Sequence, residues 1–187
     1  MRKIILLFIL IILLKTPAFA AVDDMGTYYN NTQQSTIKLL HDVDPFQDEE
    51  YYKYAWSPYP LFRTSSPLYF KDTTIPPGYY LITARNFKGN DYVLFKDNGK
   101  VKFIIPVVKK VSVSPMFYQR SVPTPKLTKW QKTRKKMKDW FFSKNKNSKK
   151  VPPPNSFIDI ADDGVYLLIK YYFGNDCYWL VFKKNKY

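Results

Sequence analysis

The fold is decided by residues 79–108, which read YYLITARNFKGNDYVLFKDNGKVKFIIPVV. Three runs rich in aromatic and β-branched residues, the composition typical of strands, lie within it at 79–87, 92–95 and 101–108. Asn98 and Gly99 separate the second run from the third. Both residues tolerate the positive φ angles that a two-residue type I′ hairpin turn requires. The stretch therefore predicts a three-stranded antiparallel meander.

A second strand pair is predicted at the C-terminus, over about residues 164–183. Gly164 precedes an apolar run, a Gly-Asn-Asp cluster at 174–176 provides turn residues, and a second apolar run ends at Phe182. The same order of Gly, Tyr-Leu, Gly-Asn-Asp and Phe-Lys is found in the meander, and either shared turn chemistry or an old duplication explains it. With both segments in one core, the sequence predicts a mostly β fold, a small antiparallel sandwich or a barrel-like domain.

The predicted β domain covers residues 67–187 and is interrupted at 115–156 by a segment of different composition. Thr128 and Gln131 have the spacing of a capping box, in which each side chain bonds the backbone N–H group of the other residue. The residues that follow have helical periodicity, so the sequence predicts a helix at about 126–142. Lys, Asn, Ser and Pro dominate the rest of the interruption, which is the composition of a linker.

Positive charge is concentrated in this interruption. Residues 126–150, which we call the basic arm, hold eleven basic residues and one acidic residue, Asp139. The whole chain has a formal net charge of +15, so the arm provides most of it. A/T-rich codons would explain a general excess of lysine, but not its concentration in one segment. Such a segment favours anionic partners, namely a membrane surface, an envelope polymer or a nucleic acid.

The predicted helix has a basic face and an aromatic face. Its candidate residues for binding an anionic surface are Lys129, Lys132, Arg134, Lys135, Lys136 and Lys138. Its candidate interfacial aromatic residues are Trp130, Trp140 and Phe141. A helix of this kind lies flat in a membrane interface. The alternative is a helix that packs its aromatic stripe on the β core and leaves its lysines in water. Nucleic acid is disfavoured as a partner, because no recognised nucleic-acid motif accompanies the charge.

The first twenty residues, 1–20, have the three parts of a secretory signal peptide. Arg2 and Lys3 are followed by an apolar run at 4–14, which is too short to span a bilayer as a helix. Ala20 then closes an Ala-Phe-Ala triplet, whose small residues a signal peptidase accepts, so cleavage is expected after Ala20. The protein is expected to be exported to the periplasm or the extracellular space, where it is soluble or peripherally associated with a membrane.

Residues 21–66 are expected to form an irregular N-terminal segment rich in Tyr. The acidic residues at 42–50 lack the regular ligand spacing and the Gly of a calcium loop, so the sequence predicts a solvated acidic loop. The aromatic residues at 51–59 either stack on a sugar or pack across the β core, and the second interpretation is favoured.

Catalysis has little support in the sequence. His41 is the only histidine and Cys177 the only cysteine. Because Cys177 lies in a predicted strand, it is expected to be a small buried apolar residue. Asp162 and Asp163, followed by Gly164, favour a turn over a pair of catalytic carboxylates. No cofactor or metal site is indicated.

The sequence therefore predicts an exported, non-catalytic binding or structural protein of the cell envelope, which contacts an anionic membrane or envelope polymer through the basic arm. Two alternatives stay open. One is a subunit of an envelope or secretion assembly, with a protein partner. The other is a hydrolase that acts on cell-wall polymers through Asp, Glu or Cys177. No small-molecule substrate is identified.

Overall fold

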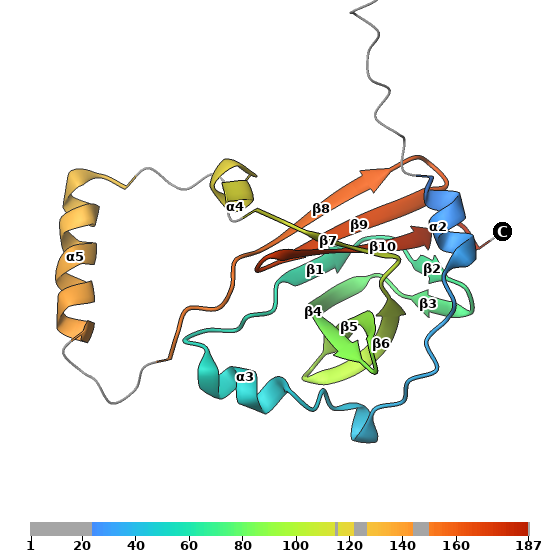
Figure 1. Ribbon diagram of the computed structural model, residues 1–187, viewed down its shortest axis with the longest axis horizontal. Helices are drawn as coiled ribbons and strands as arrows, with labels where there is room; N and C mark the ends of the chain where they lie inside the picture. The colour runs from blue at the N-terminus through green and yellow to red at the C-terminus, as the bar shows by residue number, and fades with distance from the viewer. Residues whose placement is uncertain (1–23, 115, 122–126, 144–149, 187) are drawn as a thin grey trace, which may run out of the picture.

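Two antiparallel β-sheets packed against each other form the body of the protein in the computed structural model (Figure 1). The structure describes residues 24–114, 116–121, 127–143 and 150–186, of which residues 119 and 138–143 are described by their backbone only. The predicted signal peptide at 1–20 lies outside the described residues. The mostly β, sandwich-like fold expected from the sequence is confirmed.

The first sheet has four strands in the order β1-β4-β5-β6. Their bounds are Leu61–Thr64, Gly78–Phe87, Asn90–Asp97 and Lys100–Pro106. The last three strands form the predicted meander, with consecutive strands paired antiparallel. Asn98 and Gly99 connect β5 to β6 with φ angles of 51° and 75°, which is the pair of positive φ angles that a type I′ turn requires. The predicted hairpin turn is therefore confirmed.

The second sheet has six strands, and β10 is at its centre. The strands are β2 (Leu68–Phe70), β3 (Thr73–Ile75), β7 (Lys109–Ser112), β8 (Ser156–Asp162), β9 (Tyr166–Phe173) and β10 (Asp176–Lys183). Strand β10 pairs with β9 along its full length, and its other edge pairs with β7 and, at Lys183, with β2. The predicted C-terminal hairpin at about 164–183 is therefore confirmed.

Aromatic side chains from both sheets form one core. Phe95 of β5 lies at its centre, because its ring makes edge-to-face contacts with Phe62, Tyr80 and Phe182 at centroid distances of 5.8, 6.0 and 6.1 Å. Phe62 and Tyr80 belong to the first sheet and Phe182 to the second, so these contacts join the two sheets. Burial of such large apolar groups is the dominant favourable contribution to folding.

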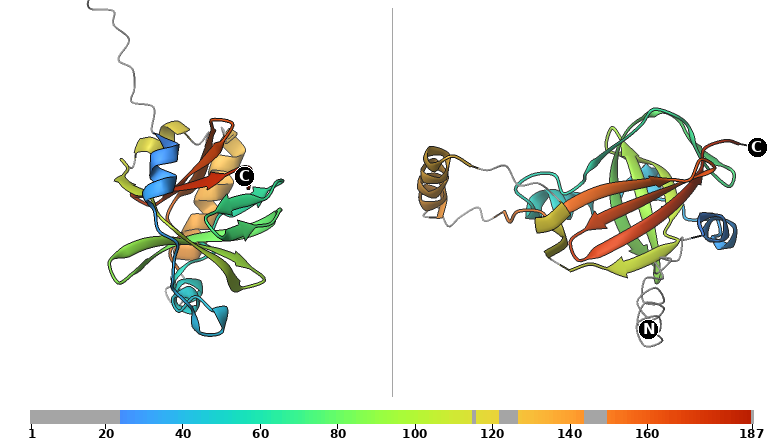
Figure 2. Two further views of the ribbon diagram at one scale, coloured as in Figure 1. Left: turned by 90° about the vertical axis from the view of Figure 1, so that its right-hand side faces the viewer. Right: turned by 90° about the horizontal axis from the view of Figure 1, so that it is seen from above.

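Helices lie around the two sheets. They are α2 (Met25–Asn31), the 3-10 helix η1 (Leu40–Asp42), α3 (Gln47–Lys53), α4 (Met116–Ser121) and α5 (Lys129–Ser143). Tyr28 of α2 contacts Trp179, and Phe117 of α4 stacks on Tyr172, so both helices cover the second sheet. Helix α3 lies beside the first sheet, and α5 stands apart from both sheets in Figure 1 and in the right-hand view of Figure 2. No helix within the described ranges is long and apolar enough to cross a membrane.

Residues 21–66, expected to be irregular, hold α2, η1, α3 and strand β1. Short helices depend on tertiary contacts more than on their own hydrogen bonds, so their sequences give weak periodic signals. Strand β1 pairs with β4 in the first sheet. The ordered β structure therefore begins before the predicted boundary at residue 67.

Candidate functional site

The capping box predicted at the start of the basic helix is present. The backbone N–H of Thr128 donates to Gln131 Oε1 over 2.9 Å, and the backbone N–H of Gln131 donates to Thr128 Oγ1 over 3.4 Å. Helix α5 follows from Lys129 to Ser143, close to the predicted range of 126–142. The two bonds satisfy backbone N–H groups that the helix itself leaves free, and so they fix where it begins.

The described side chains of α5 face solvent. Every side chain from Leu127 to Met137 is exposed, and Trp130 exposes 70% of its surface. The guanidinium of Arg134 lies 5.5 Å from the centre of the Trp130 ring, which is a cation–π contact within the helix. The described part of the aromatic stripe is therefore not packed on a sheet, contrary to the alternative of a docked helix.

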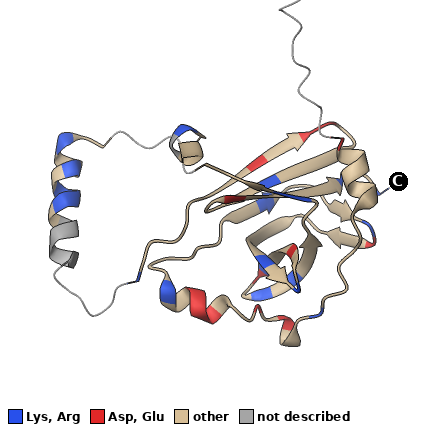
Figure 3. Cartoon of the chain, viewed as in Figure 1, with Lys and Arg blue, Asp and Glu red and all other residues tan. Residues whose placement is uncertain are grey.

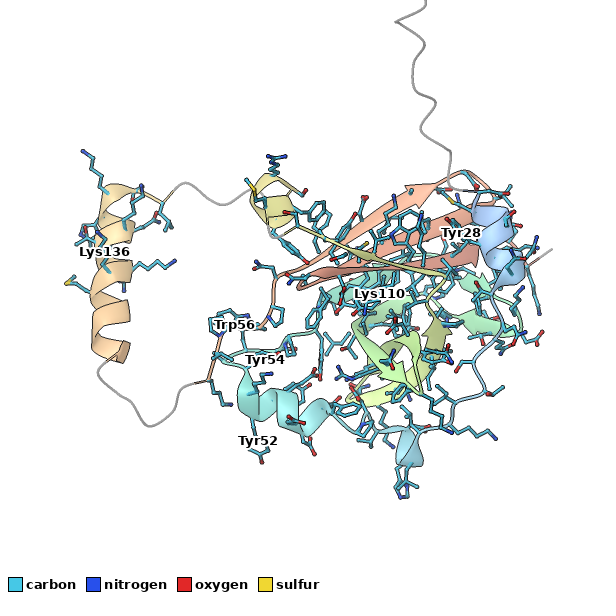
Figure 4. The ribbon with its side chains drawn as sticks, in the orientation of Figure 1. Tyr28, Tyr52, Tyr54, Trp56, Lys110 and Lys136 are labelled. Carbon is cyan, nitrogen blue, oxygen red and sulfur yellow. The ribbon has the colours of Figure 1, made fainter. Side chains whose placement is uncertain are left out.

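Most of the residues predicted to bind an anionic surface lie on this exposed part of α5. They are Lys129, Lys132, Arg134, Lys135 and Lys136, together with the aromatic Trp130. Figure 3 shows the basic residues along α5, and Figure 4 labels Lys136 among them. The side chains of Lys138, Trp140 and Phe141 lie outside the described part of the structure.

The chain returns from the basic arm to a fixed point on the body. The backbone N–H of Val151 donates to the carbonyl of Lys53 over 3.0 Å, and that of Ala55 donates to the carbonyl of Val151 over 2.9 Å. Lys150 Nζ donates to the carbonyl of Tyr51 over 3.0 Å. The C-terminal end of the arm is therefore attached to the end of α3.

Three aromatic residues lie near this attachment point, and we call Tyr52, Tyr54 and Trp56 the aromatic shoulder; Tyr54 and Trp56 lie on one side of the end of α3 and Tyr52 on the other (Figure 4). Tyr52 exposes 80% and Trp56 62% of its surface, whereas Tyr54 is half-buried with Lys53 Nζ 5.4 Å from the centre of its ring. Tyr59, a little further along the chain, exposes only 5%. The expectation that this segment packs inward is confirmed for Tyr59 and is wrong for Tyr52 and Trp56.

A buried ionic network holds the chain before the shoulder on the first sheet. The side chain of Asp44 accepts hydrogen bonds from Arg85 Nε over 3.0 Å, from Arg85 Nη2 over 2.7 Å, and from Lys96 Nζ. Arg85 belongs to β4 and Lys96 to β5. Burial alone would raise the pKa of the Asp44 carboxyl, but the hydrogen bonds from Arg85 and Lys96 outweigh burial and hold that pKa below its usual range.

Glu50 extends this network from α3 to Tyr59. Its carboxylate accepts hydrogen bonds from Arg85 Nη1 over 2.9 Å and from the Tyr59 hydroxyl. Lys96 Nζ lies 4.0 Å from the centre of the Tyr59 ring. Burial lowers the pKa of Arg85, but the hydrogen bonds to Asp44 and Glu50 more than restore it, so the guanidinium stays charged. Two carboxylates and two cations thus neutralise each other, and together they fix α3 and the shoulder in place.

The solvated acidic loop predicted at 42–50 is wrong for part of its length. Asp44 is buried and Glu50 is engaged with Arg85, whereas Asp48 and Glu49 are exposed as expected. A signal for this was available, because Arg85 and Lys96 each follow a largely apolar run in their strand. Cations in such positions need carboxylate partners if they are buried.

The structure does not bring the catalytic candidates together. Cys177 is buried in the second sheet, whereas His41 is exposed in η1, which lies against β6 of the first sheet. Asp162 Oδ1 accepts a hydrogen bond from the Gly164 N–H over 2.8 Å, and Asp163 Oδ1 accepts two from the residues that follow, so these carboxylates form the predicted turn. Within the described residues, no three His, Cys, Asp or Glu side chains are grouped as a metal site would require.

Comparison with other proteins gives no relative from which a function follows. No protein-family model, curated protein or solved structure matches the chain. What the protein contacts is therefore inferred from the charges and exposed side chains described above.

Proposed function

We propose that the protein is an exported, non-catalytic envelope protein that attaches reversibly to an anionic membrane or envelope polymer through the basic arm. The observation that supports this most directly is the exposure of α5, whose described cations and Trp130 all face solvent. An amphipathic helix is normally held by packing its apolar stripe on a core. Because the described part of α5 lacks such packing, an external partner accounts for its composition.

Electrostatic attraction provides the first part of the binding energy. Each Lys or Arg near an anionic bilayer contributes about 1 kcal/mol. Lys129, Lys132, Lys135 and Lys136 are all exposed on α5. Simultaneous contact by four such lysines gives about 4 kcal/mol, which increases affinity about a thousandfold. Dissolved salt screens exposed charges beyond about 8 Å at physiological ionic strength, so attachment is expected to weaken as salt is added.

Aromatic groups provide the second part when the partner is a bilayer. Trp and Tyr concentrate at membrane–water interfaces, because each has an apolar ring and one polar group. Trp130 on α5 and the shoulder residues Tyr52 and Trp56 are exposed in this way. A soluble polyanion pairs with the lysines alone. Substitution of the aromatic residues should therefore weaken binding to a bilayer but not binding to a soluble polyanion.

The experiment compares two variants that lose the same charge. Lys132, Lys135, Lys136 and Lys138 are changed to Gln in the arm variant, and Lys38, Lys88, Lys100 and Lys102, which are exposed on the body, are changed to Gln in the control. Cosedimentation with phosphatidylglycerol vesicles at low salt measures binding, and thermal unfolding measures stability. The arm variant should lose binding and keep its stability, and the control should keep most of both.

Two outcomes would contradict the proposal. Equal binding of the arm variant and the wild type at low salt would exclude the arm as the contact. An equal loss in both variants would indicate a response to net charge, with no localised site.

A further inference from the structure

A groove of about 630 Å³ lies on the outer face of the second sheet, and no described residue of the basic arm or of the aromatic shoulder lines it. Its apolar lining includes Val111, Met116, Phe117, Tyr172, Cys177 and Trp179. Arg120 and three serines supply its polar groups. Small-molecule sites typically enclose about 300–1,000 Å³ and combine an apolar lining with a few polar groups. The groove has the size and the composition of such a site.

Strand alternation and a short helix build this groove. Phe182 contacts the first sheet, so the even-numbered side chains of β10 face the core, and Cys177 and Trp179 face outward. Phe117 of α4 stacks on Tyr172 of β9 with ring centroids 4.3 Å apart and planes 18° from parallel. This stacking holds α4 over the sheet, and α4 then forms one wall of the groove.

Cations surround the aromatic lining. Lys109 Nζ lies 4.3 Å and Lys170 Nζ 4.6 Å from the centre of the Trp179 ring. Arg120 lines the groove near the end of α4 and is exposed. Asp159 is opposite Lys170 in the pairing of β8 with β9. Among the described residues, these three cations and one carboxylate give this face an excess of positive charge, which complements an anion.

We propose that the groove binds an anionic amphiphile with one acyl chain, either a free fatty acid or a lysophospholipid. The acyl chain lies on the apolar lining, and the carboxylate or phosphate pairs with Arg120, because guanidinium geometry matches both groups. A drug-sized volume suits one acyl chain and not a two-chain phospholipid. A neutral alcohol of the same chain length makes the apolar contacts but not the ionic contact. Comparison with this alcohol therefore measures how much the ionic contact contributes to binding.

Cys177 makes the site directly testable, because it is the only cysteine in the chain and it lines the groove. Burial raises the pKa of its thiol, so alkylation of the free protein is expected to be slow. Laurate, used below its micelle-forming concentration, should bind saturably in a calorimetric titration. At ten times its dissociation constant it should slow the alkylation of Cys177 about tenfold. Dodecanol should bind about tenfold more weakly than laurate, so at the same concentration it should slow the alkylation only about twofold.

Lysophosphatidylglycerol with the same acyl chain distinguishes the two sources of ligand. Tighter binding of laurate identifies a free fatty acid, and tighter binding of lysophosphatidylglycerol identifies a lipid released from a membrane. Both results support an anionic acyl ligand, because both compounds share the chemistry that the groove complements.

Three variants locate the binding. Arg120→Gln removes the cation and should weaken laurate binding about tenfold. Met116→Asp places a carboxylate at the first residue of α4, where a helix tolerates negative charge, and should abolish binding without unfolding the protein. Arg63→Gln removes an exposed cation from β1 and should bind laurate as the wild type does.

The proposal is overturned if laurate does not bind saturably, if dodecanol binds equally well, or if Arg120→Gln and Met116→Asp leave binding unchanged. None of these measurements uses vesicles or changes the basic arm. The result is therefore independent of the test of the proposed function, and either proposal can fail alone.

Discussion

Asp44 joins the chain just before α3 to the first sheet. Its carboxylate is shared by cations from two neighbouring strands, Arg85 and Lys96. An intact buried ion pair adds little net stability, because the cost of removing both charges from water offsets their attraction. A buried charge that has lost its partner is costly. We therefore expect the network to specify where α3 packs more than to increase the overall stability.

Asp44→Asn is predicted to lower the free energy of unfolding by about 3 kcal/mol, because Lys96 and Arg85 then stay buried without their shared carboxylate. Urea denaturation measures the change. Asp42→Asn is the matched control, since Asp42 is exposed, and it should have little effect. A loss no larger than that of the control would mean that the two cations reach water when Asp44 is removed.

The same carboxylate predicts how stability responds to acid. The pKa of Asp44 is lowered from 3.8 in the folded protein, so its contribution to stability is fully present above that value and is lost as the pH falls through the folded-state pKa. The difference in unfolding free energy between the wild type and Asp44→Asn should therefore shrink below about pH 4. Urea denaturation at about pH 7 and about pH 3 tests this. An equal difference in unfolding free energy at both pH values would mean that ionisation of Asp44 does not contribute to stability.

Substitution of Thr83 is predicted to stabilise the protein, in contrast to that of Asp44. Its side chain is buried in β4, and its hydroxyl has no hydrogen-bond partner among the described residues. Valine has the same shape without the unpaired hydroxyl, so Thr83→Val should raise the free energy of unfolding by about 1 kcal/mol. Thr74→Val, at an exposed position of β3, is the control. A loss of stability on urea denaturation would instead indicate that the Thr83 hydroxyl is hydrogen-bonded in solution.

The β5–β6 turn has a specific sequence requirement, because both of its central residues have positive φ angles. Gly99 has a φ angle of 75°, which a β-branched residue resists. Gly99→Val is therefore predicted to lower the free energy of unfolding by about 1–2 kcal/mol. Lys100→Val changes the next residue, the first of β6, and should cost much less. Similar losses for the two variants in urea denaturation would mean that the turn conformation is not the cause.

The strands that the sequence predicts are those with long apolar runs and turn residues at their ends. Strands β4, β5, β6, β9 and β10 are predicted in this way. Strand β7 is not predicted, because it begins with Lys109 and Lys110, and β8 is not predicted, because Asp159 and Asp162 interrupt its apolar residues. Each of these strands forms because a neighbouring strand in the sheet supplies its hydrogen bonds, and that information is not local.

Across the whole molecule, the sequence locates the charge of the arm but not the surfaces beside it. The arm is found because its lysines are contiguous. The ionic network joins Asp44 to Arg85 and Lys96, which lie 41 and 52 positions further along the chain. The groove likewise requires β7 to lie beside β10 and α4 to lie over β9. No periodic pattern in the sequence encodes such contacts. The residues next to Tyr52 in the sequence likewise do not show that its side chain is exposed.

Variants of the aromatic shoulder distinguish a bilayer from a polymer as the partner of the basic arm. Tyr52 and Trp56 are largely exposed, so changing both to Ala should alter the free energy of unfolding by no more than about 0.5 kcal/mol each. Burial of about 40 Å² of each ring in a membrane interface contributes about 1 kcal/mol. The double variant should therefore bind phosphatidylglycerol vesicles about thirtyfold more weakly than the wild type.

The control for this prediction is a soluble polyanion, because it pairs with lysines and offers no apolar interface. If the partner is a bilayer, the double variant should elute from immobilised heparin at the same salt concentration as the wild type, while its binding to vesicles in cosedimentation falls. Equal weakening toward heparin and vesicles would favour an envelope polymer that contacts the rings directly. Unchanged binding to both would mean that the arm makes the contact without the shoulder, since Tyr52 and Trp56 would then stay in water when the lysines are bound.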